Sequence, residues 1–284
     1  MKPASFDYFC PASLSEALTM LADNKGDCKI LAGGQSLVPA MNFRLARPAI
    51  LIDINNLAEL AFVRADHRGV VIGALTRHAI FHKPVADSPM GHLLTKVVKN
   101  IAHYPIRQRG TFGGSLSHAD PASEWCLVTR TLGADIVLKS VRGTRVVPAA
   151  DFFHGTFRTA LEEDEILTEI RFPAMPQGWA SGFCEFARRK GDFALAMSLA
   201  ALRIEGGVVR EARVGAGAVA ERPLRLQDLE HALAGKPATV ETFARVAEMS
   251  RDLVDPPADI HGSSEYRRDL LVAMIKRALA EAAQ

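Results

Sequence analysis

Two pairs of adjacent glycines, each set among apolar and hydroxyl residues, are the features of this sequence best suited to bind an anion. The first pair lies in "AGGQS" (32–36) and the second in "TFGGS" (111–115). Successive backbone N–H groups without bulky side chains form a concave anion site, and hydroxyls add donors without adding negative charge. Each pair alone is typical of an ordinary turn. Two pairs of similar composition favour two loops that hold a pyrophosphate from two sides.

Two other patterns resemble functional sites but lack the context that such sites need. "VGAGAVA" (214–220) matches the dinucleotide fingerprint G-x-G-x-x-A, but that fingerprint requires a following helix, and Pro223 lies just beyond it. We therefore interpret this segment as the end of a strand. Ser117, His118 and Asp120 are neighbours in the sequence, whereas the members of a catalytic triad assemble in space. They do not indicate a hydrolase.

The spacing of histidines and cysteines indicates no metal site. His78 and His82 are four residues apart, as in a zinc pair, but no nearby Glu or Cys completes a site, and we expect two exposed histidines on a helix. Iron–sulfur clusters and structural zinc need paired thiolates, and no C-x-x-C spacing occurs. The cysteines, which we expect to be buried free thiols, are Cys10, Cys28, Cys126 and Cys184.

The length of 284 residues predicts two domains, because single cores rarely grow beyond about 250 residues. With 48% hydrophobic and 23% charged residues, the composition is typical of a soluble globular protein. The net charge of +2 argues against a nucleic-acid partner. No apolar run reaches the ~18 residues of a membrane helix, and the N-terminus lacks the apolar core of a signal peptide. We expect no membrane insertion and a cytoplasmic location.

Hydrophobic periodicity predicts the elements that position the glycine pairs. Ser13 and Glu16 predict the capped start of a first helix, and "CKILAGG" predicts a strand that runs into the first pair. "PAILIDI" predicts a second strand, and "LAFVRAD" with "GVVIGA" predicts a hairpin. We expect Thr76 to cap a short helix and a further helix at 89–99.

After the second glycine pair, Asp120 and Pro121 predict the start of a helix that ends near Gly133. "ADIVLKS" and "GTRVVPA" predict a strand pair, and "DEILTEIRFP" predicts a strand that ends at Pro173. "PAMPQG" (173–178) is the expected linker to an α+β second domain. That domain is expected to hold strands near 181–188, 193–204 and 207–219 and helices near 226–234, 239–253 and 263–283.

The glycine-pair segments together resemble one protein family. "LAGGQSLVPAMNFRLARPAILIDI" is similar to the first phosphate loop of the FAD-binding medium subunit of molybdenum hydroxylases, and "IRQRGTFGGSLSHADPASE" is similar to its second. The similarity continues through "EILTEIRFP", "FARRKGDFALA" and "SSEYRRDLLVAMIKRAL", so it spans almost the whole chain in order. The family includes the aerobic carbon monoxide dehydrogenase flavoprotein and the flavin domain of xanthine dehydrogenase.

The resemblance implies an α+β fold with two domains. A PCMH-type FAD-binding domain would occupy residues 1–176 and consist of two α/β subdomains, at about 1–57 and 58–176. A C-terminal domain like that of the carbon monoxide dehydrogenase flavoprotein would occupy 177–284. It would hold a three-stranded antiparallel sheet and a helical bundle.

The resemblance also implies which residues bind FAD. The backbones of the two glycine segments would hold the pyrophosphate in the space left by the missing side chains. Ile101 would lie near the isoalloxazine ring, Glu124 would contact FAD, and Phe193 would cover the ring. The expected set is Ala32, Gly33, Gly34, Gln35, Ser36, Leu37, Ile101, Thr111, Phe112, Gly113, Gly114, Ser115, Glu124, Leu167 and Phe193.

We expect this FAD to be bound non-covalently, because no His or Cys matches the attachment residue found elsewhere in the fold class. We name no catalytic residue and no metal ligand in this chain. Many relatives carry a lysine close to the cofactor where this sequence has Glu185, and a carboxylate cannot replace an ammonium donor. Either Lys190 or an arginine takes over the contact, or the contact is absent.

By resemblance, the chain is the FAD-carrying electron-transfer subunit of a heterotrimer. A large subunit would bind the molybdopterin cofactor and select the substrate. A small subunit would carry two [2Fe–2S] clusters and pass electrons to FAD, which delivers them to an external acceptor. The complex is expected to be a dimer of heterotrimers. The alternatives are a free-standing FAD-dependent oxidase or reductase of the same fold class and a binding module that has lost FAD.

Overall fold

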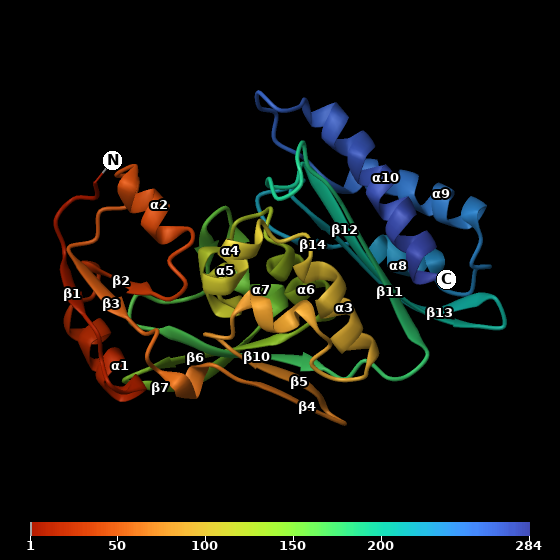
Figure 1. Cartoon of the computed structure of the whole chain (residues 1–284). Helices are drawn as coiled ribbons and strands as arrows, with labels where there is room; N and C mark the ends of the chain where they lie inside the picture. The colour runs from red at the N-terminus through yellow and green to blue at the C-terminus, as the bar shows by residue number, and fades with distance from the viewer. Residues whose placement is uncertain (1) are drawn as a thin grey trace.

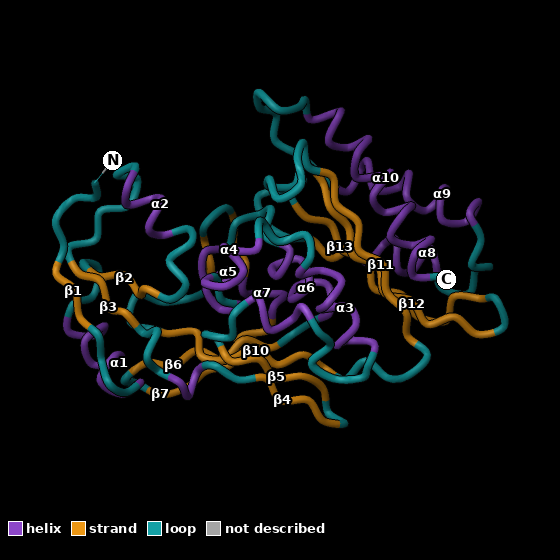
Figure 2. Tube along the Cα trace, viewed as in Figure 1, coloured by secondary structure: helices purple, strands orange, loops and turns teal. Residues whose placement is uncertain are grey.

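Three β-sheets organise the chain, which is described by a computed structural model that covers residues 2–284. The sheets are formed within residues 7–53, 63–173 and 179–225. Figure 1 shows the N-terminal sheet (red and orange) at one end and, beside it, a layer of helices with a sheet on either side. Figure 2 shows the same layers coloured by element type. The mixture of helices and sheets confirms the expected α+β class, whereas the exact domain boundaries stay a prediction.

The N-terminal sheet is parallel because its strands are joined through helices rather than through tight turns. Its elements are β1 (Asp7–Phe9), α1 (Leu14–Asp23), β2 (Cys28–Leu31), α2 (Leu37–Asn42) and β3 (Ile50–Asp53). β3 lies between β1 and β2 and pairs in parallel with both. As predicted, Ser13 caps α1, since its Oγ accepts a 3.2 Å hydrogen bond from the Glu16 N–H. The first glycine pair follows β2 at the carboxyl edge of this sheet, where ligands of parallel sheets commonly bind.

The middle sheet is antiparallel and contains the two predicted strand pairs. Its strands, in spatial order, are β4 (Val63–Asp66), β5 (Gly69–Gly73), β10 (Ile166–Pro173), β6 (Asp135–Ser140) and β7 (Gly143–Pro148). Outside this sheet lie η1 (Ala58–Leu60) and a small pair formed by β8 (Phe153–Gly155) and β9 (Arg158–Thr159). Pro173 is the last residue of β10, as expected for a residue without a backbone N–H.

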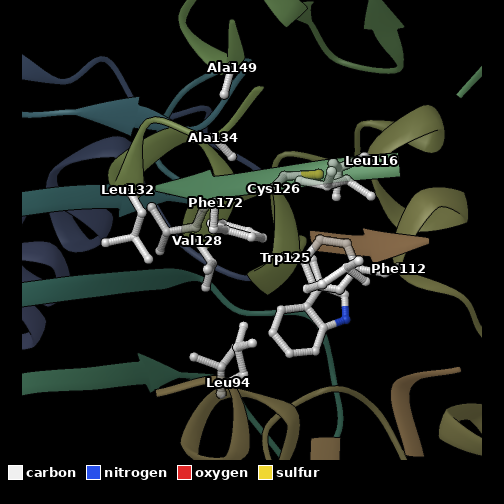
Figure 3. Close-up of a cluster of buried hydrophobic side chains, with 14 of the residues drawn as sticks. Leu94, Phe112, Leu116, Trp125, Cys126, Val128, Leu132, Ala134, Ala149 and Phe172 are labelled. Carbon is white, nitrogen blue, oxygen red and sulfur yellow. The ribbon is translucent and has the colours of Figure 1, made fainter. Parts of the chain in front are cut away.

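A layer of helices lies between the middle sheet and the C-terminal sheet (Figure 1). It consists of η2 (His78–His82), α3 (Pro89–Val98), α4 (Tyr104–Arg109), α5 (Phe112–His118), α6 (Glu124–Leu132) and α7 (Ala149–Phe152). Its core is a cluster of buried apolar side chains that includes three aromatic rings (Figure 3): Phe112 stacks on Trp125 with ring centroids 4.7 Å apart, and Phe172 from β10 meets Phe112 edge-on. These buried side chains fix the position of the second glycine pair, which directly follows Phe112.

The start of α6 differs from the prediction. α6 begins at Glu124 with Ser123 as its N-cap residue, and the side chain of Asp120 instead accepts a 2.8 Å hydrogen bond from the Ala122 N–H. The prediction that Asp120 caps this helix is therefore wrong. The residues before it form the additional helix α5, which ends where Ala119 adopts φ of 52°.

The start of η2 also differs from the prediction. Thr76 caps no helix, because its hydroxyl donates to the Phe62 carbonyl oxygen, and η2 begins after Arg77. His78 is buried rather than exposed, and its Nδ1 accepts a 3.0 Å hydrogen bond from the Trp125 indole N–H. Burial and the charge of Arg77 lower the pKa of His78 to about 3, so this histidine is a neutral core residue.

The C-terminal part consists of three long antiparallel strands, as expected, with a short fourth strand at one edge. Its elements are β11 (Trp179–Phe186), β12 (Ala196–Glu205), β13 (Val208–Gly217), β14 (Leu224–Arg225), α8 (Gln227–Leu233), α9 (Val240–Glu248), η3 (Met249–Leu253) and α10 (Ser264–Ala282). α10 packs closely on β11 at Gly182, where a Cβ would lie 2.1 Å from the Ala278 carbonyl oxygen. "VGAGAVA" (214–220) is the end of β13 and the turn after it, as predicted.

The cysteines are free in the structure. Cys28 and Cys126 are buried, Cys184 is half-buried and Cys10 is exposed, so the expectation of a buried thiol is wrong for Cys10. Within residues 2–284, no group of three His, Cys, Asp or Glu side chains is placed to hold a metal ion. Over the same residues, no helix combines the length and apolar character that a membrane crossing requires.

Candidate cofactor-binding site

The first glycine pair forms the loop between β2 and α2, and its backbone N–H groups have no protein partner. In the described chain, none of the N–H groups from Gly33 to Leu37 donates to a protein acceptor. Gly34 has φ of 71°, in the left-handed region that favours glycine. By contrast, the Gly33 carbonyl oxygen accepts a 2.8 Å hydrogen bond from Gln35 Nε2. A run of consecutive free N–H groups can surround an anion, and such groups are seldom left without any partner.

Gly33 is required by the contact between the two glycine segments. A Cβ at Gly33 would lie 2.5 Å from the Arg109 carbonyl oxygen and 2.8 Å from Gly110 Cα. The space that a side chain would need is therefore filled by the backbone that leads into the second pair, and it is not open to a ligand. The missing side chain brings the two segments into contact.

The second glycine pair lies in the first turn of α5. Backbone hydrogen bonds join the start of this helix to the residues that follow β5. The N–H groups of Phe112 and Gly113 donate to the carbonyl oxygens of Thr76 and Ala74, each at 2.9 Å. A Cβ at Gly113 would lie 2.6 Å from Ala74 Cβ, so this glycine too allows a close approach of protein to protein.

The remaining N–H groups of the second pair are also used within α5. The Gly114 N–H donates to Thr111 Oγ1 at 3.1 Å, and the Ser115 N–H donates to the Thr111 carbonyl oxygen at 3.1 Å. In the described chain, the Thr111 N–H and the Ser115 hydroxyl have no protein partner. The second segment therefore offers a ligand fewer backbone donors than the first.

Asn55 and Arg77, two residues that the sequence interpretation missed, join the two segments. Asn55 Nδ2 donates to the Ala32 carbonyl oxygen at 2.7 Å and to Asp53 Oδ1 at 2.5 Å. Arg77 donates through one terminal nitrogen to Asn55 Oδ1 at 2.6 Å and through the other to the Arg109 carbonyl oxygen. Asn55 follows β3 beside the end of β2. A polar residue at the carboxyl edge of a parallel sheet is a pattern from which this residue could have been predicted. No local pattern marks Arg77.

Ile101 lies in a turn that Arg107 holds in place. The next residue, Ala102, has φ of 42°, a backbone conformation that costs energy for any residue other than glycine. Arg107 Nη1 donates to the carbonyl oxygens of Ile101 at 2.7 Å and Ala102 at 2.9 Å. The side chain of Ile101 is buried. These hydrogen bonds stabilise the strained turn in one conformation.

A cavity of about 260 Å³ lies beside this turn. It is lined by Asn100, Glu185, Ala187, Arg189, Lys190 and Gly191. A Cβ at Gly191 would lie 2.4 Å from His103 Cε1, so the loop after β11 contacts the turn that carries Ile101. Phe193, on the same loop, leaves 71% of its surface exposed.

Two carboxyl groups with raised pKa values belong to this region. Burial, together with the negative charge of Glu185, raises the pKa of Glu124 to about 8. Burial raises the pKa of Glu185 to about 7, and its Oε2 atom is buried without a hydrogen-bond partner. Burial therefore favours the protonated form of both carboxyl groups more than in an ordinary exposed glutamate.

The structure brings the two glycine segments together. The other residues that were expected to contact FAD range from fully buried to exposed. A Cβ at Gly114 would lie 4.0 Å from Ala32 Cβ. The side chains of Phe112 and Leu167 are in the core, with 0% and 4% of their surfaces exposed, whereas Phe193 is on the surface. The assignment of these residues to a cofactor stays a prediction.

Two protein-family models match the chain in succession. The family described as FAD binding domain in molybdopterin dehydrogenase matches residues 4–175. The family described as CO dehydrogenase flavoprotein C-terminal domain matches residues 181–282. Together they span nearly the whole chain, so the chain carries an FAD-binding domain.

Individual relatives match over almost their full length. The chain is 40% identical to caffeine dehydrogenase subunit beta of a Pseudomonas strain, over 100% of this chain and 96% of that protein. It is 36% identical to the carbon monoxide dehydrogenase medium chain of Hydrogenophaga pseudoflava, over 98% and 97%. Among solved structures, quinoline 2-oxidoreductase from Pseudomonas putida superposes with a TM-score of 0.95 at 39% identity, over 100% of this chain and 99% of that chain. The chain therefore belongs to the FAD-binding medium subunits of the molybdenum hydroxylase family, which are subunits of oxidoreductases.

Proposed function

We propose that this chain binds FAD non-covalently and works as the electron-transfer subunit of a heterotrimeric molybdenum-containing dehydrogenase. The observation that carries the proposal is the run of free N–H groups from Gly33 to Leu37, held against the second glycine segment. A pyrophosphate needs several donors at one place, and neutral backbone donors meet that need without a titratable group.

The two segments take different parts in this binding. The backbone of 32–37 supplies most of the donors to the pyrophosphate, while Thr111 and Ser115 add one N–H and hydroxyl donors from the other side. Asn55 and Arg77 act as positioning residues, because they hold the two segments at a fixed separation. Bound FAD supplies the redox chemistry, and the protein supplies binding and orientation.

The region around Ile101 is proposed to receive the isoalloxazine ring. Arg107 fixes the backbone of the Ile101 turn, and Glu124 contributes a polar contact to the cofactor. Leu167 supports this part of the site from the core, and the exposed ring of Phe193 is available to cover the flavin.

The partners of the chain are proposed to carry the other redox groups. Relatives are named as a medium chain or as one subunit of a dehydrogenase, and this chain has no paired cysteines for an iron–sulfur cluster. We assign the [2Fe–2S] clusters to a small subunit and the molybdopterin cofactor to a large subunit, assembled as a dimer of heterotrimers. Large exposed apolar side chains around α2, such as Phe43 and Leu45, fit a surface that another subunit covers.

Affinity purification of the full chain, expressed with its neighbouring genes, tests this proposal. We expect flavin absorbance, release of intact FAD on denaturation, and molybdenum and iron in the same complex. Flavin without either metal, together with turnover of a small substrate by the chain alone, would instead indicate a free-standing oxidase or reductase. Protein that stays colourless after FAD is added would overturn the proposed cofactor itself.

A further inference from the structure

We propose that Arg267, near the start of α10, is a positioning residue that fixes the loop between β11 and β12 (187–195) beside the Ile101 turn. The anchoring of this loop rests on contacts within the chain. The consequence for the flavin rests on the proposed function, in which the region around Ile101 receives the isoalloxazine ring. Arg267 would keep the same protein surface next to that ring.

The first turn of α10 contacts both ends of the loop. Arg267 Nη1 donates to the carbonyl oxygen of Leu195, the last residue of the loop, at 3.2 Å. Tyr266, one residue earlier on the helix, meets the ring of Phe186 edge-on, with ring centroids 6.5 Å apart. The Leu195 N–H also donates to the Phe186 carbonyl oxygen at 2.8 Å. The base of the loop is therefore fixed to α10 from both strands.

The middle of the loop lies against the turn that carries Ile101. A Cβ at Gly191 would lie 2.4 Å from His103 Cε1, and the loop lines the 260 Å³ cavity through residues that include Arg189 and Lys190. Within residues 2–284, no side chain other than Arg267 forms a hydrogen bond with the backbone of the loop. Without Arg267, the loop would keep only its own backbone bonds and its packing contacts.

Arg267 is itself held by an acidic partner. Its side chain is 6% exposed, and its Nη2 donates to Asp259 Oδ2 at 2.7 Å. Asp259 is fixed in turn, because its Oδ1 accepts a 2.8 Å hydrogen bond from the His261 N–H. Burying a charged pair costs desolvation and seldom adds net stability compared with apolar side chains. What this arginine contributes is therefore the fixed position of Leu195.

Hydrogen exchange of the full chain, with or without FAD, tests the anchoring. Arg267→Met keeps the length of the side chain and removes both of its bonds. Exchange at the Leu195 N–H should accelerate by about tenfold or more, since bonds from a charged donor are lost. Exchange in the N-terminal and middle sheets should stay unchanged. Arg268→Met is the matched control, because Arg268 bonds to Val254 and Asp255 and not to the loop.

Asp259→Ala provides a second variant, because Asp259 is 43% exposed and its loss leaves the core intact. It frees Arg267 from its partner and should accelerate exchange at Leu195 in the same direction, by less. Unchanged exchange at Leu195 in the variants that fold would overturn the proposal. An equal acceleration throughout the chain would also overturn it, because it would show a general loss of stability.

Quenching of flavin fluorescence by acrylamide tests the consequence for the cofactor. In the FAD-loaded chain, quenching should be stronger in Arg267→Met than in the wild type or Arg268→Met, while FAD stays bound through the untouched glycine segments. A faster-exchanging loop with unchanged quenching would overturn the proposed role and leave the proposed function intact. Failure of the wild type to bind FAD would overturn the proposed function, and exchange at Leu195 would still decide whether Arg267 anchors the loop.

Discussion

In the loop after β2, the backbone N–H groups from Gly33 to Leu37 remain free, whereas in the first turn of α5 those from Phe112 to Ser115 are bonded within the protein. The two segments share a glycine pair and a following serine, yet only the first keeps a row of backbone donors. The second is anchored by its bonds to Ala74 and Thr76 and serves as the rigid surface against which the first is held. Similar short motifs can thus divide binding and support between them.

Adding one methyl group at Gly33 should break this arrangement most severely. In Gly33→Ala, the new Cβ would meet Arg109 and Gly110 backbone atoms at under 3 Å, so the segments must separate. We expect loss of bound flavin and a cost of about 1–3 kcal/mol in the free energy of unfolding. Flavin absorbance per chain and urea unfolding measure the two effects.

Gly155→Ala is the control for this substitution, because its Cβ would lie in ordinary contact, 3.6 Å from Glu221 Oε2. It should retain flavin. A Gly33→Ala protein with unchanged flavin content would contradict the division of roles between the segments.

Removing the link between the segments should have the next largest effect. Arg77→Met deletes the donors to Asn55 and Arg109 while keeping much of the side-chain length. Loss of hydrogen bonds from a charged donor is worth roughly 1.5–3 kcal/mol, so FAD affinity should fall by about tenfold or more. The dissociation constant, measured by quenching of FAD fluorescence, reports this change. Arg68→Met, at an exposed arginine, should have no effect, and an equal loss in both variants would refute the role of Arg77.

Removing single hydroxyls should sharpen the comparison. Ser115→Ala removes one of few donors that the second segment offers, whereas Ser36→Ala leaves the free N–H groups of the first in place. We expect a loss of about 1 kcal/mol in FAD binding for Ser115→Ala and a smaller loss for Ser36→Ala. The ratio of the two dissociation constants is the measurement, and a larger effect at Ser36 would reverse the assignment of donors.

A pH dependence of the free energy of unfolding belongs to the ring end of the site and not to the glycine segments. The pKa of Glu124 is raised from 4.5 to about 8 in the folded protein, so the folded state keeps a proton that the unfolded chain releases. Its stabilising contribution is complete below pH 4.5 and is lost as the pH rises toward 8.

Urea unfolding at several pH values should show this decline in the wild type and a flatter dependence in Glu124→Gln. Ser115→Ala should keep the wild-type slope, because the glycine segments carry no titrating group. A Glu124→Gln protein with the wild-type slope would show that another group is responsible.

The sequence predicted the strands and the glycine segments because these depend on local patterns: apolar runs, adjacent glycines and capping residues. It missed α5, because two glycines in a first turn disfavour a helix by roughly 1 kcal/mol each. The bonds to Ala74 and Thr76 and the cap at Thr111 override that preference, and they form between segments that the sequence does not show to be neighbours. The burial of His78 was missed for the same reason, since its partner is Trp125.

The helical layer between the middle and C-terminal sheets determines whether the two parts of the chain could fold separately. α6 contacts β10 on one side and β12 and β13 on the other, and one continuous apolar core includes residues from both parts of the chain. Two family descriptions meet near residue 178, yet the chain has no surface there along which it could be separated cleanly. The two parts should therefore unfold together, and a chain cut after the first part would expose to water the surface of α6 that packs on β12 and β13.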